Sequence, residues 1–115
     1  MRRTALALML SLAAATALSQ APSGALTDDK GMTLYTFDKD ADGKSMCNGP
    51  CATNWPPYLA GPDAKPHGTW TVVTRDDGGK QWAVKGKPVY RWAKDTKPGD
   101  KTGDNVNNVW HVAKD

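Results

Sequence analysis

The sequence contains no glutamate, and its twelve acidic residues are all aspartates. Because aspartate favours turns over helix interiors, this bias indicates a chain rich in turns and poor in long helices. No window repeats apolar residues at helical spacing over a useful length, and at most residues 52–55 form one helical turn before Pro56 and Pro57 stop it. The lack of amphipathic helices argues against a helical fold and favours an all-β one.

Long hydrophobic runs are also missing, apart from one near the N-terminus. Residues 5–18 are almost all small or apolar, but they are fewer than the roughly 20 that span a bilayer, and Arg2 and Arg3 precede them. This pattern is typical of a secretory signal peptide, which we expect to cover residues 1–19 and to be cleaved before Gln20. With no cysteine at the junction to accept a lipid, the mature chain is expected to be periplasmic or secreted, without a transmembrane anchor.

Charge of either sign is nearly balanced once the expected signal peptide is removed. The full chain has 15 basic and 12 acidic residues, a net charge of +3, and loss of Arg2 and Arg3 leaves 13 against 12, a net charge of +1. So weak a field argues against nucleic-acid binding and against electrostatic docking on membranes. An envelope or extracellular partner of unknown identity remains, and the oligomeric state is left open.

No constellation of catalytic residues is recognisable in the chain. It has no Ser-His-Asp order, no phosphate-binding glycine loop and no zinc-ligand spacing, and its only histidines are His67 and His111. We therefore expect no catalytic residues and no cofactor. The sequence favours a non-catalytic binding or structural module over an enzyme.

What the sequence does contain is an internal repeat. Residues 31–40 align without a gap with residues 86–95, and the same offset of about 55 residues places Trp55 on Trp110. The repeated motif is Tyr35, Phe37 and Asp40 in the first unit and Tyr90, Trp92 and Asp95 in the second. Two copies of one supersecondary unit are too few for a solenoid, so we expect them to pair into one compact domain.

Alternating β-formers separated by turn residues predict a set of antiparallel hairpins. The expected strand pairs are 26–27 with 32–37, 69–75 with 81–84, and 81–84 with 88–92, while 109–112 close the sheet. The predicted fold class is all-β: a small antiparallel sheet or sandwich built from two pseudo-repeats of hairpin plus irregular loop. The repeat units cover about 26–57 and 81–112 of a single domain over 20–115.

Two pairs of aromatic residues recur at equivalent strand positions and point to one face of their strands: Tyr35 with Phe37, and Tyr90 with Trp92. We expect them, together with Trp70 and Trp82, to form the core, because a small β domain needs the area that aromatic rings bury. The alternative is an exposed stacking platform for a sugar, a peptide or an aromatic ligand. In either case we expect the tyrosines to keep a polar edge at the surface.

Cys47 and Cys51 are the only cysteines, and in an oxidising compartment we expect them to form a disulfide. The bridge would close a short loop, for which chain entropy predicts a stabilisation of about 2 kcal/mol. The alternative is a copper-binding or thiol-redox module centred on this segment. Its candidate metal ligands are Met46, Cys47, Cys51 and His111.

Aspartates offer two further candidate sites. Asp38, Asp40 and Asp42 alternate before a glycine and could bind calcium weakly, but the closing glutamate of a calcium loop is missing, which favours a solvated turn. Asp40 and Asp95 each lie three residues after the last aromatic residue of their strand. We expect them to accept backbone N–H groups of the following loop; the alternative is a paired-carboxylate active site.

These motifs together resemble a known family. They are Tyr35-x-Phe37-x-x-Asp40, Tyr90-x-Trp92-x-x-Asp95, the segment from Ser45 through Cys47 and Cys51 to Trp55-Pro56-Pro57, and the closing Trp110-His111-Val112. Over about residues 24–113 they are similar to the bacterial secreted-repeat family, whose members are often described as predicted lipoproteins. The resemblance implies an extracytoplasmic domain of two repeats and implies no activity. This chain departs from the lipoprotein members because it lacks the lipid-acceptor cysteine.

Overall fold

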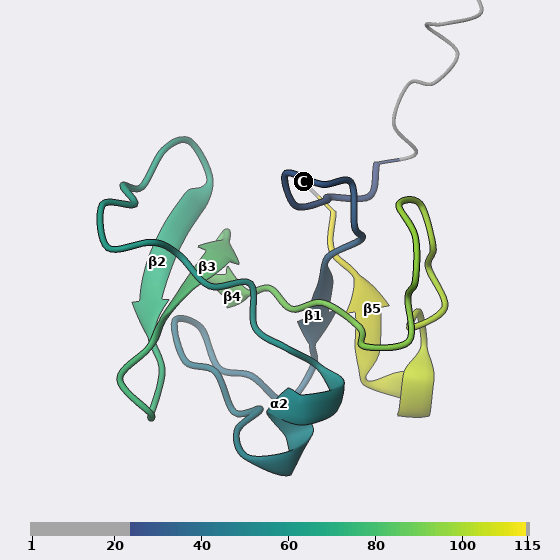
Figure 1. The fold of residues 1–115 in the computed structure, drawn as a ribbon. Coiled ribbons are helices and arrows are strands. Elements are labelled where there is room, and N and C mark those ends of the chain that lie inside the picture. Colours follow the sequence, from purple (N-terminus) through teal and green to yellow (C-terminus); the bar gives the residue numbers. More distant parts are fainter. Residues whose placement is uncertain (1–23, 115) are drawn as a thin grey trace, which may run out of the picture.

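The computed structural model of the protein describes residues 24–114 (Figure 1). The expected signal peptide and its cleavage site lie outside the described residues. In this range the elements are β1 (Tyr35–Phe37), α2 (Pro50–Asn54), β2 (Trp70–Thr74), β3 (Lys80–Val84), β4 (Lys87–Pro88), the 3-10 turn η2 (Val106–Asn108) and β5 (Trp110–Val112). The all-β fold class is confirmed. Among the described residues, no helix is long and apolar enough to cross a membrane.

The strands form two small antiparallel sheets. One contains β2, β3 and β4 in that order, on the left in Figure 1, and the other contains β1 and β5, on the right. The sheets are joined where Tyr35 and Tyr90 exchange backbone hydrogen bonds, with N···O distances of 2.8 and 2.9 Å. The two repeated tyrosines therefore lie opposite each other at the junction between the sheets.

Two of the predicted hairpins are confirmed, and turn chemistry explains both. β2 pairs with β3 from Trp70 opposite Val84 to Thr74 opposite Lys80, around the Asp- and Gly-rich turn. β3 and β4 are joined by Lys85 and Gly86, whose φ values are 54° and 84°. A two-residue turn with both φ values positive matches the twist of the flanking strands, which is why glycine is suited to this position.

The first predicted hairpin forms next to its turn but is shorter than expected. Thr27 bridges Thr33, and the N–H groups of Asp28 and Leu34 donate to the carbonyls of Met32 and Leu26, both at 2.9 Å, whereas β1 pairs with β5. In the turn, Oδ1 of Asp28 accepts the N–H groups of Lys30 and Met32 at 2.8 and 3.0 Å. The aspartate side chain therefore holds the turn.

The strand predicted over residues 88–92 is also shorter than expected, because β4 ends at Pro88. Val89 still donates its N–H to the carbonyl of Trp82 in β3 at 3.0 Å, and Tyr90 then forms isolated bridges with Tyr35 and Pro57. Arg91 continues this contact by donating its N–H to the carbonyl of Pro56 at 2.7 Å. The second motif strand therefore pairs with the Pro-Pro segment, where proline has no N–H to extend a ladder.

The two repeat units are interlocked by equivalent contacts. The N–H of Asp38 donates to the carbonyl of Val109 at 2.8 Å, and the N–H of Ala93 donates to the carbonyl of Asn54 at 2.9 Å. These two hydrogen bonds are equivalent, because Ala93 lies 55 residues after Asp38 and Asn54 lies 55 residues before Val109. The helical turns α2 and η2 fall at equivalent places. Each motif strand thus pairs with the segment that follows the helical turn of the other unit.

Aromatic rings fill the space between the interlocked units as a four-ring stack of Phe37, Trp110, Trp55 and Trp92. Adjacent centroids along this stack are 4.1, 3.8 and 4.0 Å apart. Tyr35 packs edge-on against Trp55, and Tyr90 packs edge-on against Trp110. The expectation that the motif aromatics form the core therefore agrees with the packing in the structure.

The same expectation holds only in part for Trp70 and Trp82, which do not belong to the four-ring stack. They are half-buried and pack on a second cluster that contains Leu34, Val84 and Val89. They come from the β2–β3 hairpin and not from the motif strands. Two core clusters therefore replace the single aromatic core that the sequence predicted.

Candidate functional site

The tyrosine and aspartate of each repeat motif form a cross-repeat clasp. The hydroxyl of Tyr35 donates to Oδ2 of Asp95 at 2.6 Å, and the hydroxyl of Tyr90 donates to Oδ2 of Asp40 at 2.7 Å. Both tyrosines have no exposed surface. The expectation that tyrosine keeps a polar edge at the surface is therefore wrong, because the hydroxyl finds its acceptor inside the protein.

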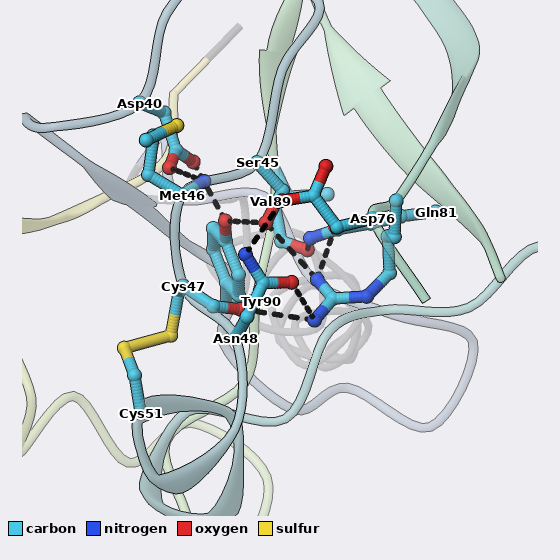
Figure 2. The surroundings of a disulfide bond; sticks show 11 residues. Asp40, Ser45, Met46, Cys47, Asn48, Cys51, Asp76, Gln81, Val89 and Tyr90 are labelled. Carbon is cyan, nitrogen blue, oxygen red and sulfur yellow. Dashed lines mark hydrogen bonds between the residues drawn. A yellow bond between two sulfur atoms is a disulfide. The ribbon is translucent and has the colours of Figure 1, made fainter. Parts of the chain in front are cut away.

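The second oxygen of each aspartate holds the loop that follows it. Oδ1 of Asp40 accepts the N–H of Met46 at 2.7 Å (Figure 2), and Oδ1 of Asp95 accepts the N–H of Thr102 at 3.0 Å. This is the loop-fixing role that the sequence favoured. With both oxygens of each carboxylate committed to the protein itself, the geometry explains the repeat motif as a structural device.

Burial shapes the ionisation of the clasp. It raises the pKa of Tyr35 and Tyr90 far above the usual value near 10, and the aspartate acceptors raise it further. Burial also raises the pKa of Asp40, while the N–H of Met46 and the Tyr90 hydroxyl oppose that shift. Buried phenols with such acceptors resist deprotonation, a consequence that alkaline unfolding can test.

The predicted disulfide between Cys47 and Cys51 is confirmed (Figure 2). It joins the loop after Asp40 to the first turn of α2, with 5.2 Å between the two Cα atoms. Figure 2 shows the bridge on one side of the loop and the hydroxyls of Ser45 and Tyr90, 2.5 Å apart, on the other. The bridge thus lies next to the Tyr90–Asp40 half of the clasp.

Arg75 holds the same loop from inside the protein, and the sequence interpretation missed it. Its Nη1 donates to Oγ of Ser45 and Oε1 of Gln81 at 3.0 and 2.8 Å, and its Nη2 donates to the carbonyl of Cys47 at 2.9 Å. The residue is only 4% exposed. One signal could have found it, since Arg75 continues the inward-facing positions of β2 after Val73.

Loss of the disulfide is expected to weaken the protein without changing its shape. Replacing both cysteines, as in Cys47→Ser/Cys51→Ser, should lower the free energy of unfolding by about 2 kcal/mol, because the closed loop is short. Arg75 and Asp40 continue to hold the loop through the Cys47 carbonyl and the Met46 N–H. Urea denaturation of the variant and of the oxidised protein measures the difference; failure of the variant to fold would show that the bridge does more than close this loop.

The candidate copper ligands do not form a site. Both sulfur atoms of Cys47 and Cys51 are used in the disulfide, and Met46 is an exposed side chain. His111 lies in β5, where its Nε2 is 2.8 Å from Oδ2 of Asp38. The structure therefore offers no thiolate pair for copper or for thiol redox chemistry in its oxidised form.

The candidate calcium ligands line one small hollow of about 150 Å³ but do not converge on a common point. Asp38 interacts with His111, Asp40 with Tyr90 and Met46, and Lys87 adds a positive charge to the same lining. Across residues 24–114, no group of three or more acidic, histidine or cysteine side chains is arranged to hold a metal ion. The aspartates act in pairwise contacts instead.

A different feature of the surface has the shape of a binding site. We call it the aromatic groove: a hollow of about 310 Å³ lined by Thr27, Asp28, Asp29, Tyr58, His67, Trp70 and Trp82. Trp70 and Trp82 stand at 89° with centroids 5.9 Å apart, and Tyr58 is edge-on to Trp70 at 6.4 Å. His67 completes the set at 5.6 Å from Trp82. Four rings therefore surround one open concavity: His67 is nearly parallel to Trp70, at 14° with centroids 6.3 Å apart, while Trp82 and Tyr58 are nearly perpendicular to Trp70.

Acidic residues give the groove its charge. Burial alone would raise the pKa of Asp28, but backbone N–H groups and Arg91, whose Nε is 2.7 Å from Oδ2, outweigh it and hold that pKa below its usual value. The Arg91 guanidinium lies 5.1 Å from the centroid of the Tyr58 ring. Asp29 is exposed, so its carboxylate faces solvent at the edge of the groove.

The groove is where the two repeat units differ most. The N–H of Trp82 donates to the carbonyl of Tyr58, and in the other unit the N–H of Leu26 donates to the carbonyl of Ala113, both at 2.9 Å. Leu26 and Ala113 thus occupy the places that Trp82 and Tyr58 have in the groove. The repeat architecture of the other unit therefore forms without rings at these places, while Trp82 and Tyr58 both pack on the second core cluster and line the groove.

A larger hollow of about 420 Å³ lies beside β5, but its lining is less suited to a ligand. It is formed by Ala25, Lys101, Asp104, His111, Val112 and Lys114. Lys101 and Lys114 bring positive charge to it and Asp104 brings negative charge, and His111 is engaged with Asp38. We therefore identify the smaller aromatic groove as the candidate site, because apolar rings with few polar groups are typical of ligand pockets.

Comparison with known proteins agrees with the repeat. A family model described as a secreted repeat of unknown function matches the chain twice, over residues 19–58 and 71–114. These segments contain the two units expected from the sequence, so the resemblance stated above is confirmed. No curated protein and no solved structure matches the chain.

Proposed function

Since this chain belongs to the family of secreted repeats of unknown function, we propose that it is an exported, non-catalytic module that binds a small ligand in the aromatic groove. In this proposal residues 1–19 direct export and are removed, and the mature protein acts in the periplasm or outside the cell. The repeat motif, the disulfide and Arg75 supply the scaffold. The groove supplies the function.

The observation that carries the proposal is the aromatic surface left open in the groove. Trp70, Trp82 and Tyr58 are all half-buried and gather around one hollow. Tyr35, Tyr90 and Trp55 are buried, and Phe37 and Trp92 are half-buried at the two ends of the four-ring stack. Covering apolar area gains about 25 cal/mol per Å², so a ligand that fills the groove recovers free energy that the fold leaves unused. Concave sites with several rings and a few polar groups are the usual form of a small-molecule pocket.

The repeat provides matched variants for a test. Trp82→Leu copies the Leu26 of the other unit and removes a ring from the groove, whereas Trp92→Phe copies Phe37 and changes only the four-ring stack. The probes are choline, N-acetylglucosamine trisaccharide and phenylacetate. We expect at least one of them to bind the natural protein and the Trp92→Phe variant equally well, and to bind the Trp82→Leu variant about 10-fold more weakly.

Ligand-observed NMR of the three probes measures this binding, and circular dichroism checks that each variant is folded. Equal binding to Trp82→Leu and to the natural protein would place the ligand elsewhere. Binding of none of the probes would contradict a small-ligand groove. Conversion of a probe to product in the same samples would contradict a non-catalytic role.

A further inference from the structure

The rings of the groove present electron-rich faces at several angles. Trp70 and Trp82 are nearly perpendicular, and Tyr58 is nearly perpendicular to Trp70. A flat ligand that stacks on Trp70 cannot also stack on Trp82 or Tyr58, whereas a compact, rounded group can contact the face of one ring and the neighbouring rings together. The negative face of an aromatic ring attracts cations, most strongly when the ring belongs to tryptophan.

The charges around the groove also favour a cation. Its lining contains two aspartates and no lysine or arginine. Arg91 lies over the ring of Tyr58 and is paired with Asp28, so these two charges offset each other. The exposed Asp29 forms no ion pair within residues 24–114, and its charge remains. The field of Asp29 and Asp28 also contributes, after burial, to raising the pKa of Tyr58. The groove therefore favours a positive occupant.

Two polar side chains of the lining are already engaged inside the protein. Oδ1 of Asp28 accepts two backbone N–H groups and its Oδ2 accepts Arg91, so both oxygens are occupied. Nδ1 of His67 lies 3.1 Å from the carbonyl oxygen of Lys65. A saccharide needs several free donors and acceptors for its hydroxyls, and neither Asp28 nor Nδ1 of His67 is free to supply one.

We propose that the aromatic groove binds an alkylated ammonium group, with Trp70, Trp82 and Tyr58 contacting its methyl or methylene groups and Asp29 balancing its charge. This inference rests on the proposed function, because it takes the groove as the ligand site. The ammonium group can belong to a free small molecule or to a lipid headgroup. The recognised chemistry is the same in both.

The decisive comparison is between choline and its neutral isostere, 3,3-dimethylbutan-1-ol, which has the same shape without the charge. Titration of the exported protein, followed by tryptophan fluorescence and by protein NMR shifts, should give binding of choline about 10-fold tighter than binding of the alcohol. Asp29→Asn should reduce that preference several-fold while leaving the affinity for the alcohol unchanged. Asp42→Asn removes an equal charge at a different hollow and should leave both affinities unchanged.

The remaining outcomes separate this inference from the proposed function. Equal affinity for choline and the alcohol, or no saturation by millimolar choline, overturns the ammonium inference. If N-acetylglucosamine trisaccharide binds and Trp82→Leu abolishes that binding, the groove remains the ligand site but its ligand is a sugar. If choline binds and the protein co-sediments with phosphatidylcholine vesicles, the ammonium group belongs to a lipid headgroup. If choline binds and the protein does not co-sediment with the vesicles, the ammonium group belongs to a free molecule.

Discussion

Trp55→Ala is expected to cost about 3–5 kcal/mol of unfolding free energy, and Trp110→Ala should cost a similar amount. The two tryptophans occupy equivalent places in the middle of the four-ring stack, with planes 3° from parallel and centroids 3.8 Å apart. They are only 5% and 3% exposed, and each has a second stacked ring and an edge-on tyrosine. Small domains have total stabilities of about 5–15 kcal/mol, so each variant should be close to unfolding.

Urea denaturation of the variants at neutral pH measures these losses. Trp92→Phe is the matched control, because it keeps a ring at the end of the stack and copies Phe37, so it should cost less than about 1.5 kcal/mol. A Trp55→Ala variant as stable as Trp92→Phe would contradict a core built on the stack. Strongly unequal losses for Trp55→Ala and Trp110→Ala would contradict the equivalence of the two repeat units.

The hairpins were predictable because local chemistry determines them. The Asp- and Gly-rich turn before β3 and the Lys85-Gly86 turn specify their strand pairs within a few residues of sequence. Pairing between distant segments was not predictable in this way. The 55-residue offset shows which residues are equivalent, but it does not show that β1 pairs with β5 across the repeats instead of with its own unit.

The sequence allowed either an aromatic core or an exposed aromatic platform, but it did not show which rings would form the candidate site. In the structure Tyr35, Tyr90, Trp55 and Trp110 are buried in the core and Phe37 and Trp92 are half-buried against it, while Trp70 and Trp82 line a groove. Their separation depends on the packing of the β2–β3 hairpin against Leu34 and Val89, which no local pattern encodes. The non-recurrence of Trp82 and Tyr58 was the signal in the sequence that could have distinguished them.

Raising the pH above about 10 is expected to unfold the protein steeply, through the two buried tyrosines. In the unfolded chain their phenols lose a proton near pH 10, whereas burial and the aspartate acceptors keep Tyr35 and Tyr90 protonated in the folded protein. Above the unfolded pKa the folded state therefore binds more protons than the unfolded state, and stability falls as pH rises. Each tyrosine contributes about 1.4 kcal/mol per pH unit, so the pair contributes about 2.7 kcal/mol per unit.

Urea denaturation at intervals from about pH 8 to about pH 11 measures this slope, and tyrosinate absorbance of the folded protein shows whether the phenols stay protonated. The double variant Tyr35→Phe/Tyr90→Phe removes both hydroxyls, so it should be less stable at neutral pH but should lose stability more slowly above pH 10. Tyr58 is present in both proteins, so its contribution cancels from the comparison. The test compares how steeply the free energy of unfolding falls with pH in the two proteins, so a loss of packing that is the same at every pH does not affect it. Equal slopes would mean that the tyrosines of the clasp do not keep their protons in the folded protein.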